Sequence, residues 1–332
     1  MKRFFLNILL LGFFVFATLY LYDVVIHKVN DSYTKEIQLI SKAKIISLGS
    51  SSGLRLKWGA KKPDEISNLC MNGADLFSEV EVLNAIADHL SPSQLVFLEV
   101  NSFKMYQIST RIYDTSRVYK LNLQTASFYN DLPLSFIDNK LLWKYICSKA
   151  IAVNGVINFE GAFNVMFKKV LPFSIYEKLD RNSLKNEEWL IHERGSFDKM
   201  AKIQKKDIID ATNDCKGIRE KTLEAMQKVK NIADEYHITL IAYSCPRHQI
   251  YLKTLGKAML EPTDSLLSMS LKKCNIPYFD NSSDKDFVND YSSFYDCIHL
   301  NKIGAQKFDD KLFKEVSLAF PQYSEFFKGM IR

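Results

Sequence analysis

The chain has 332 residues, of which 47% are hydrophobic and 13% aromatic. This composition is typical of a folded protein and excludes a disordered or low-complexity chain. The 44 basic and 38 acidic residues are interspersed and leave a net charge of +6, so no nucleic-acid partner is expected. The length accommodates one large α/β domain with an insertion, or two smaller domains.

The N-terminus carries an apolar segment of membrane length. Lys2 and Arg3 precede a run from Phe4 to Tyr22 that is almost entirely apolar. At about 1.5 Å per residue, a helix of this length comes close to crossing a hydrocarbon layer roughly 30 Å thick. A cleaved signal peptide is the alternative, but its apolar region usually has about 7 to 15 residues. We therefore expect an uncleaved signal anchor within residues 1–26.

The charge asymmetry around this segment predicts the orientation of the protein. Basic residues before an anchor favour retention of the N-terminus in the cytoplasm. The rest of the chain contains no second apolar run of membrane length. We therefore expect a single-pass protein of the cell membrane, with a stalk at residues 27–43 and a large folded part outside the cytoplasm.

Short apolar runs bounded by turn residues predict buried strands. Four such runs are present: Ile45 to Leu48, Ile66 to Met71, Leu95 to Val100 and Ile238 to Tyr243. Apolar residues at helical spacing predict a helix from Asp75, a candidate N-cap, to Leu90 and another from about residue 210 to 236. Strands and helices that alternate in this way predict parallel strands joined by right-handed crossovers.

The C-terminal part completes this pattern. We predict a weaker strand at Tyr278 and Phe279, and a last helix from Lys302 to about Phe320 with Asn301 as its N-cap. The fold class is therefore α/β, a doubly wound parallel sheet flanked by helices. Active sites of such sheets form outside the carboxyl ends of the strands.

Residues 102–206 interrupt the alternation of strands and helices. The segment is rich in aromatic residues and poor in strand-like patterns. We predict that it is a largely helical insertion into a domain made of residues 44–101 and 207–332. It is either a lid or acceptor-binding element, or a purely structural subdomain. Its lysine cluster is interpreted as a solvated helix face: Lys199, Lys202, Lys205 and Lys206.

The six cysteines are too few and too scattered for a disulfide scaffold. No Cys/His pattern has the spacing of metal ligands, so neither a metal nor a cofactor is expected. Cys70 and Cys245 lie in or beside apolar runs, where a buried free thiol and a disulfide both stay open. Cys297 is interpreted as a neighbour of a catalytic motif rather than as a nucleophile.

Two motifs carry candidate chemistry. Asp296 stands three residues before His299, the spacing that lets a carboxylate orient an imidazole base. Taken alone, this motif is equally a turn aspartate with a loop histidine. The first strand ends in Gly49 and a run of serines, where the carboxyl edge of a parallel sheet exposes a hydroxyl. Any of these serines is alternatively a helix N-cap.

In their order along the chain, these motifs resemble those of the SGNH/GDSL hydrolase superfamily, specifically its membrane-anchored cell-envelope branch. Gly49-Ser50-Ser51 corresponds to the Gly-Asp-Ser turn of that family, with Ser51 as the nucleophile and Ser50 in place of the usual aspartate. Asp296 and His299 correspond to its Asp-x-x-His motif. The resemblance covers residues 44–101 and 238–320. It implies an SGNH/flavodoxin-like three-layer sandwich.

The same resemblance implies an oxyanion hole. Gly73 follows the second predicted strand and Asn101 follows the third, as do the oxyanion-binding residues of the family. By this correspondence, the N–H groups of Ser51 and Gly73 and the side-chain amide of Asn101 bind the oxyanion. His299 deprotonates Ser51 in the implied reaction, and water or a sugar hydroxyl resolves the acyl-enzyme.

Members of this branch that the chain resembles include the D-alanyl-transfer protein of teichoic-acid modification and SGNH-like proteins of polysaccharide O-acetylation. They imply an acyl-esterase or O-acyltransferase acting on acetyl or D-alanyl esters of an envelope polysaccharide or teichoic-acid-like polymer. A transferase would need an acyl donor outside the cytoplasm, so a multi-pass membrane O-acyltransferase is the expected partner.

Other functions stay open at this point. A catalytically silent SGNH fold could bind polymer or assist assembly, and a membrane-surface lipase would require a deep apolar pocket in the insertion. Arg247 and His248 follow the fourth predicted strand and are candidates for substrate contact. A turn with exposed polar side chains is the alternative for these two residues.

Overall fold

The computed structural model describes residues 38–53, 60–70, 74–92, 94–101, 194–214 and 218–331, together with residues 10, 13, 36 and 56. The predicted membrane helix lies outside the described residues apart from two positions, and so does the predicted insertion up to residue 193. Within the part of the chain that is described, no helix combines the length and the apolar character needed to span a membrane.

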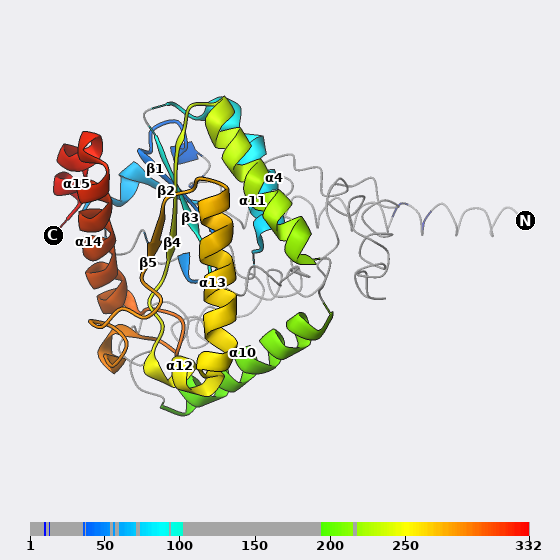
Figure 1. Ribbon diagram of the computed structural model, residues 1–332. Helices are drawn as coiled ribbons and strands as arrows, with labels where there is room; N and C mark the ends of the chain where they lie inside the picture. Colours follow the sequence, from blue (N-terminus) through cyan, green and yellow to red (C-terminus); the bar gives the residue numbers. More distant parts are fainter. Residues whose placement is uncertain are drawn as a thin grey trace, which may run out of the picture.

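The described residues form one parallel sheet of five strands in the order β2-β1-β3-β4-β5 (Figure 1). In chain order the strands are β1 (Ile45–Leu48), β2 (Ile66–Asn68), β3 (Leu95–Glu99), β4 (Thr239–Ser244) and β5 (Tyr278–Asp280). All five expected strands are therefore present, and the α/β class is confirmed. The chain moves to one side of β1 for β2 and to the other side for β3, which makes the β1/β3 boundary the topological switch point.

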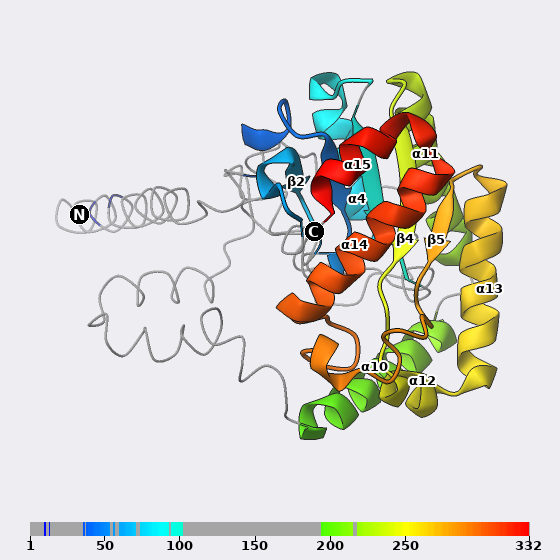
Figure 2. The ribbon, with the colours of Figure 1, turned by 90° about the vertical axis from the view of Figure 1, so that its left-hand side faces the viewer.

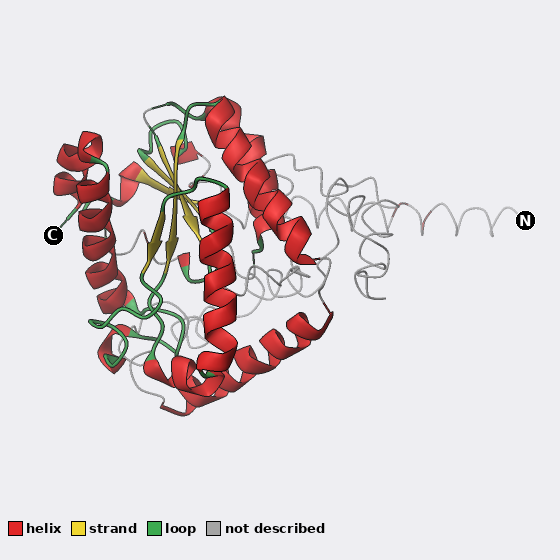
Figure 3. Ribbon diagram, viewed as in Figure 1, coloured by secondary structure: helices red, strands yellow, loops and turns green. Residues whose placement is uncertain are grey.

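Helices cover both faces of the sheet (Figures 1 and 3). On one face lie α4 (Leu76–Ile86), α11 (Ile218–Glu235) and α13 (Lys257–Lys273). On the other lie α14 (Lys302–Ala319) and α15 (Ser324–Met330), with α15 folded back beside α14 (Figure 2). Two further helices, α10 (Arg194–Asp214) and α12 (Gln249–Leu255), pack on each other near the carboxyl ends of the strands.

Alternating strand side chains build a hydrophobic core on each face. Leu48 and Leu98 belong to the core beneath α4, α11 and α13. Phe97 and Tyr243 belong to the opposite core, where the Phe97 ring lies 6.4 Å from that of Phe313 on α14. A parallel sheet covered on both faces needs strands that are largely apolar, and β1, β3 and β4 have this character, with buried polar exceptions such as Ser47 and Glu99.

Helix ends follow the predicted caps. Asp75 caps α4 through a reciprocal capping box with Ser78, and Asn301 caps α14 by accepting the N–H of Gly304 at 3.0 Å. The helix that the sequence predicts from about residue 210 begins later in the structure, where α11 starts at Ile218. Residues 210–214 belong to α10 instead. The predicted domain boundary at residue 206 also falls inside α10.

Short 3-10 helices complete the described part of the chain: η2 (Pro63–Glu65), η3 (Ala87–His89), η7 (Tyr291–Ser293) and η8 (Pro321–Tyr323).

We expect Gly304→Ala to lower the free energy of unfolding by at least about 1–3 kcal/mol, as overpacking usually does. A Cβ at this position would lie 1.9 Å from the backbone oxygen of Ser293, so the main chain itself would have to shift. Gly329→Ala in α15 is the matched control, because its Cβ would meet only the flexible end of Lys62 at 3.4 Å. Urea denaturation of both variants checks the prediction, and equal stabilities would contradict it.

Candidate active site

A glycine shapes the turn that follows β1. Gly49 has a φ of +151°, a backbone conformation that other residues rarely adopt. A Cβ at this position would lie 2.5 Å from the Cβ of Glu99, the last residue of the neighbouring strand β3. Glycine therefore lets the turn pack directly onto β3. The next two residues, Ser50 and Ser51, are thereby held at the carboxyl edge of the sheet.

Asp296 organises the second half of the site. One of its carboxylate oxygens accepts the backbone N–H groups of Ile298 and His299 at 2.9 and 2.8 Å. The other lies 2.8 Å from Nδ1 of the His299 ring. Burial raises the pKa of the Asp296 carboxyl, but the bonds from His299 and Ile298 outweigh burial and hold this pKa below its usual value. A carboxylate only accepts hydrogen bonds, so Nδ1 carries the ring proton and Nε2 is the basic nitrogen.

The two halves meet through Ser51 and His299. The hydroxyl oxygen of Ser51 lies 2.7 Å from Nε2 of His299, although the two residues are 248 positions apart in the chain. The structure thus brings Ser51, His299 and Asp296 into one line of hydrogen bonds. In this arrangement the imidazole can take the proton of the hydroxyl while the carboxylate orients the ring.

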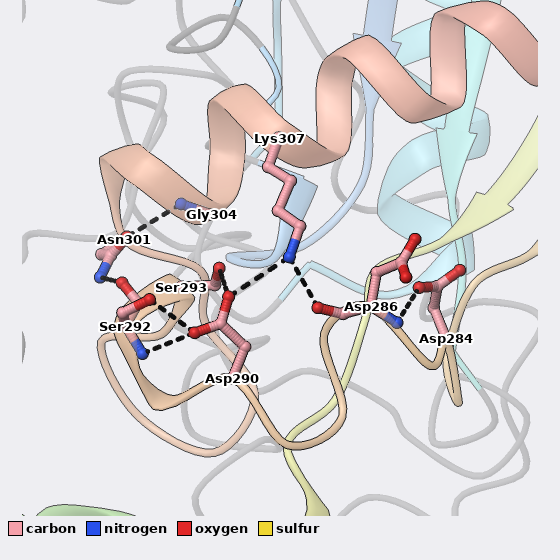
Figure 4. Close-up of polar contacts among 8 residues, drawn as sticks. All are labelled: Asp284, Asp286, Asp290, Ser292, Ser293, Asn301, Gly304 and Lys307. Atoms are coloured by element: carbon pink, nitrogen blue, oxygen red, sulfur yellow. Dashed lines mark hydrogen bonds and ion pairs between the residues drawn. The ribbon is translucent and has the colours of Figure 1, made fainter.

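Asp290 holds the segment that precedes the Asp296 turn (Figure 4). Its carboxylate accepts hydrogen bonds from the N–H and hydroxyl of Ser292 and from the hydroxyl of Ser293. Lys307 of α14 lies 3.3 Å from the same carboxylate and donates to the backbone oxygen of Asp286 at 2.7 Å. Partial burial raises the pKa of Asp290, but these bonds prevail and lower it to about 2. The segment is therefore docked on α14.

Asn301 fastens the other end of the same loop. Its side-chain nitrogen donates to the backbone oxygen of Ser292 at 2.7 Å, and its side-chain oxygen accepts the N–H of Gly304 (Figure 4). An isolated antiparallel bridge between Phe294 and Leu300 closes the loop around Asp296 and His299. Asp296 and His299 are thus carried by a turn that hydrogen bonds hold at both ends.

The predicted oxyanion residues are only partly described. Gly73 lies outside the described residues. Asn101 follows β3 and is half-buried, with its side-chain nitrogen 3.3 Å from Oε1 of Glu99. Glu99 itself was not singled out from the sequence, although a charged residue inside an apolar strand is a signal for a buried polar contact. Its other carboxylate oxygen accepts the N–H and the hydroxyl of Ser50 at 2.8 and 2.7 Å.

Arg247 and His248 lie in the interior, so the alternative of an exposed turn is wrong. Arg247 is 5% exposed, and its guanidinium lies 3.5 Å from the carboxylate of Asp264 on α13. His248 is fully buried and caps α12 by accepting the N–H of Ile250 at its Nδ1. Its ring packs 4.0 Å from that of Tyr291. The sequence could not show that Asp264 and Tyr291 are neighbours of these residues, because both come from other elements, α13 and η7.

The cysteines of the described residues are buried thiols: Cys70, Cys245, Cys274 and Cys297. Burial, together with the charge of Asp296, raises the pKa of the Cys297 thiol well above its ordinary value. A thiol with a raised pKa is a poor nucleophile, because the thiolate is the reactive form. Cys297 therefore lies beside Asp296 in the chain but is a poor candidate for a nucleophile.

A hydroxyl bonded to an imidazole that is bonded to a buried carboxylate activates a serine for attack on a carbonyl carbon. Among the described residues, no cluster of His, Cys, Asp or Glu side chains could hold a metal ion. A scan against models of protein families finds no match, and a search of curated proteins finds none either. The assignment of the chemistry therefore depends on the residues of the site themselves.

We expect His248 to make the stability of the protein depend on pH between about 4 and 6.5. Burial lowers the pKa of His248 to about 4, whereas an unfolded histidine binds a proton near pH 6.5. The unfolded state binds more protons in this interval, so the free energy of unfolding falls by up to about 3 kcal/mol as the pH drops through it.

Denaturation of wild type and His248→Gln between pH 4 and 7 checks this expectation. The variant should lack the part of the pH dependence that His248 contributes. His89→Gln, which removes an exposed histidine of η3, is the control for loss of a histidine elsewhere. Identical pH profiles for wild type and His248→Gln would contradict the prediction.

Proposed function

We propose that the chain is a membrane-anchored serine acyl-esterase or O-acyltransferase of the SGNH type, with its catalytic domain outside the cytoplasm. The proposal is carried by the line of hydrogen bonds from Ser51 through His299 to Asp296. These are the three groups that acyl transfer through a serine requires. The strand order, which is the flavodoxin-like one, supports an SGNH-like sandwich, as does the position of Ser51 at the switch point.

In the proposed reaction, Nε2 of His299 accepts the proton of Ser51 while the hydroxyl oxygen attacks the carbonyl carbon of an ester. The carbonyl electrons move onto its oxygen, which the N–H groups of Ser51 and Gly73 and the amide of Asn101 stabilise. Each such donor is typically worth about 2.7–4 kcal/mol of barrier. The C–O bond to the alcohol then breaks, and His299 returns the proton to the alcohol. Water or a sugar hydroxyl releases the acyl group by the same steps.

The proposed substrates are acetyl or D-alanyl esters of an envelope polysaccharide or teichoic-acid-like polymer. The support is the resemblance of the ordered motifs to envelope-associated SGNH proteins, together with the N-terminal apolar segment. A multi-pass membrane O-acyltransferase would supply acyl groups if the protein is a transferase. The alternative of a catalytically silent scaffold does not account for the hydrogen bonds among Ser51, His299 and Asp296. A scaffold would not need an imidazole that a buried carboxylate aligns on a serine hydroxyl.

A fluorophosphonate probe tests the nucleophile in the full-length chain. We expect the wild-type protein to be labelled and Ser51→Ala to take up no label, because the probe bonds to an activated hydroxyl. His299→Ala should slow labelling by about 10³-fold through loss of the general base. Ser52→Ala, which removes the next hydroxyl along the turn, is the control and should label like wild type. An unlabelled wild type, or a labelled Ser51→Ala, would refute the assignment.

Analysis of the surface polymer distinguishes removal of acyl groups from their addition. In cells that lack the protein, acyl groups per polymer repeat should fall if the protein is a transferase and rise if it is an esterase. Mass analysis of the purified polymer measures the change. Wild-type protein should restore the original acylation, whereas Ser51→Ala should not. Acylation that is unchanged by deletion would count against both forms of the proposal.

A further inference from the structure

The turn between β4 and α12 binds the segment that carries Asp296 and His299. Three consecutive main-chain N–H groups of this turn each donate to a backbone oxygen of the chain that follows β5: Arg247 to Ser282 at 3.1 Å, His248 to Cys297 at 3.0 Å and Gln249 to Val288 at 2.7 Å. Cys297 lies between Asp296 and His299 in the chain. Of these three bonds, the one from His248 therefore reaches the candidate acid and base most directly.

The side chain of His248 packs against the same segment. The ring is fully buried, and its Nδ1 caps α12 by accepting the N–H of Ile250 at 3.3 Å. Tyr291 and Phe294, which precede Asp296, lie with their ring centroids 4.0 and 5.5 Å from that of His248. Because the cap and these ring contacts fix the side chain, the main-chain N–H of His248 keeps its direction toward Cys297.

The beginning of this turn contacts the serine turn. The thiol of Cys245 lies 3.6 Å from the backbone oxygen of Ser52, the residue after Ser51. A thiol is a weak donor, so this contact contributes mainly packing. The turn between β4 and α12 consequently contacts both halves of the candidate site.

We propose that His248 is a positioning residue: its main-chain N–H, bonded to Cys297, keeps the His299 imidazole within reach of the nucleophilic hydroxyl. The proposal rests on the acyl-transfer function proposed above. Asp296 and His299 bond to each other within their own turn, so loss of the bond from His248 leaves this pair intact. It instead displaces the whole turn from the serine, and a displacement of about 1 Å can slow a reaction by about 10²-fold.

A comparison of His248→Ala with His248→Pro isolates the main-chain bond. Both variants lose the ring and the cap, but only proline also lacks the N–H. Proline fits this position, since His248 has a φ of −75° and a ψ of 151°. We expect fluorophosphonate labelling of the full-length chain to be slower in His248→Pro than in His248→Ala by about 10-fold or more. Equal rate constants would overturn the proposal.

Gln249 supplies the matched control. Its N–H donates to Val288 over a similar distance, and proline is favoured at the first position of a helix, which Gln249 occupies in α12. Gln249→Pro and Gln249→Ala should label at equal rates, because Asp290 and Lys307 still dock the segment after Val288 on α14. A loss in Gln249→Pro as large as that in His248→Pro would show a general effect of proline in this turn and would overturn the proposal.

Two further readouts separate positioning from a merely structural effect. Partial unfolding lowers the final labelled fraction, whereas a displaced base lowers the rate constant, so the two are measured separately. In the His299→Ala background, His248→Pro and His248→Ala should label at equal rates, because no base is left to position. A difference that persists there means that His248 acts through another residue, which overturns the proposal. A wild type that takes up no label refutes the proposed function instead.

Hydrogen exchange measures the bond without changing His248. In full-length protein labelled with ¹⁵N-histidine, the main-chain amides of His248 and His299 are assigned by their loss in His248→Gln and by the shift in His299→Ala. If the bond holds the turn, the two amides open together, so we expect protection factors of the same order. Exchange of the His248 amide like that of an exposed amide, or protection that differs between the two by more than about 10²-fold, overturns the proposal. This measurement decides the matter even if His248→Pro fails to fold.

Discussion

The close packing of the turn after β1 against the end of β3 is the contact on which the candidate site depends. A side chain at Gly49 would collide with Glu99, so glycine is what lets the turn contact the end of the strand. The Glu99 carboxylate accepts hydrogen bonds from the N–H and the hydroxyl of Ser50. A buried carboxylate without donors costs on the order of several kcal/mol, so the turn and the strand end stabilise each other. Ser51 is consequently held in one position at the topological switch point of the sheet.

Asp296 and His299, the candidate acid and base, belong to a different rigid part. Asp296 and His299 lie on a turn that Asn301 joins to the start of α14, while Asp290 and Lys307 dock the preceding segment on the same helix. This turn therefore keeps its geometry independently of the serine turn. The sheet and α14, packed through their shared core, bring the two parts to hydrogen-bonding distance. The candidate site is pre-organised because both parts are rigid.

Much of this arrangement could be predicted from local patterns. The strands were evident from apolar runs, and the caps Asp75 and Asn301 from residue type and position. The burial of Arg247 and His248 could not be predicted, because polar residues after a strand usually face solvent, and their partners come from α13 and η7. The contacts of Glu99 were missed for the same reason, since its partner Ser50 follows a different strand, β1.

The sequence by itself determined the elements of the α/β fold and the pairing of Asp296 with His299. Both depend on contacts between residues a few positions apart, which local spacing encodes. Only the tertiary structure decided that Ser51 faces His299 and that Ser50 binds the carboxylate of Glu99. These contacts join residues 248 and 49 positions apart. The second exists because β1 and β3 end side by side at one edge of the sheet, and the first because α14, which follows the His299 turn, packs on that sheet.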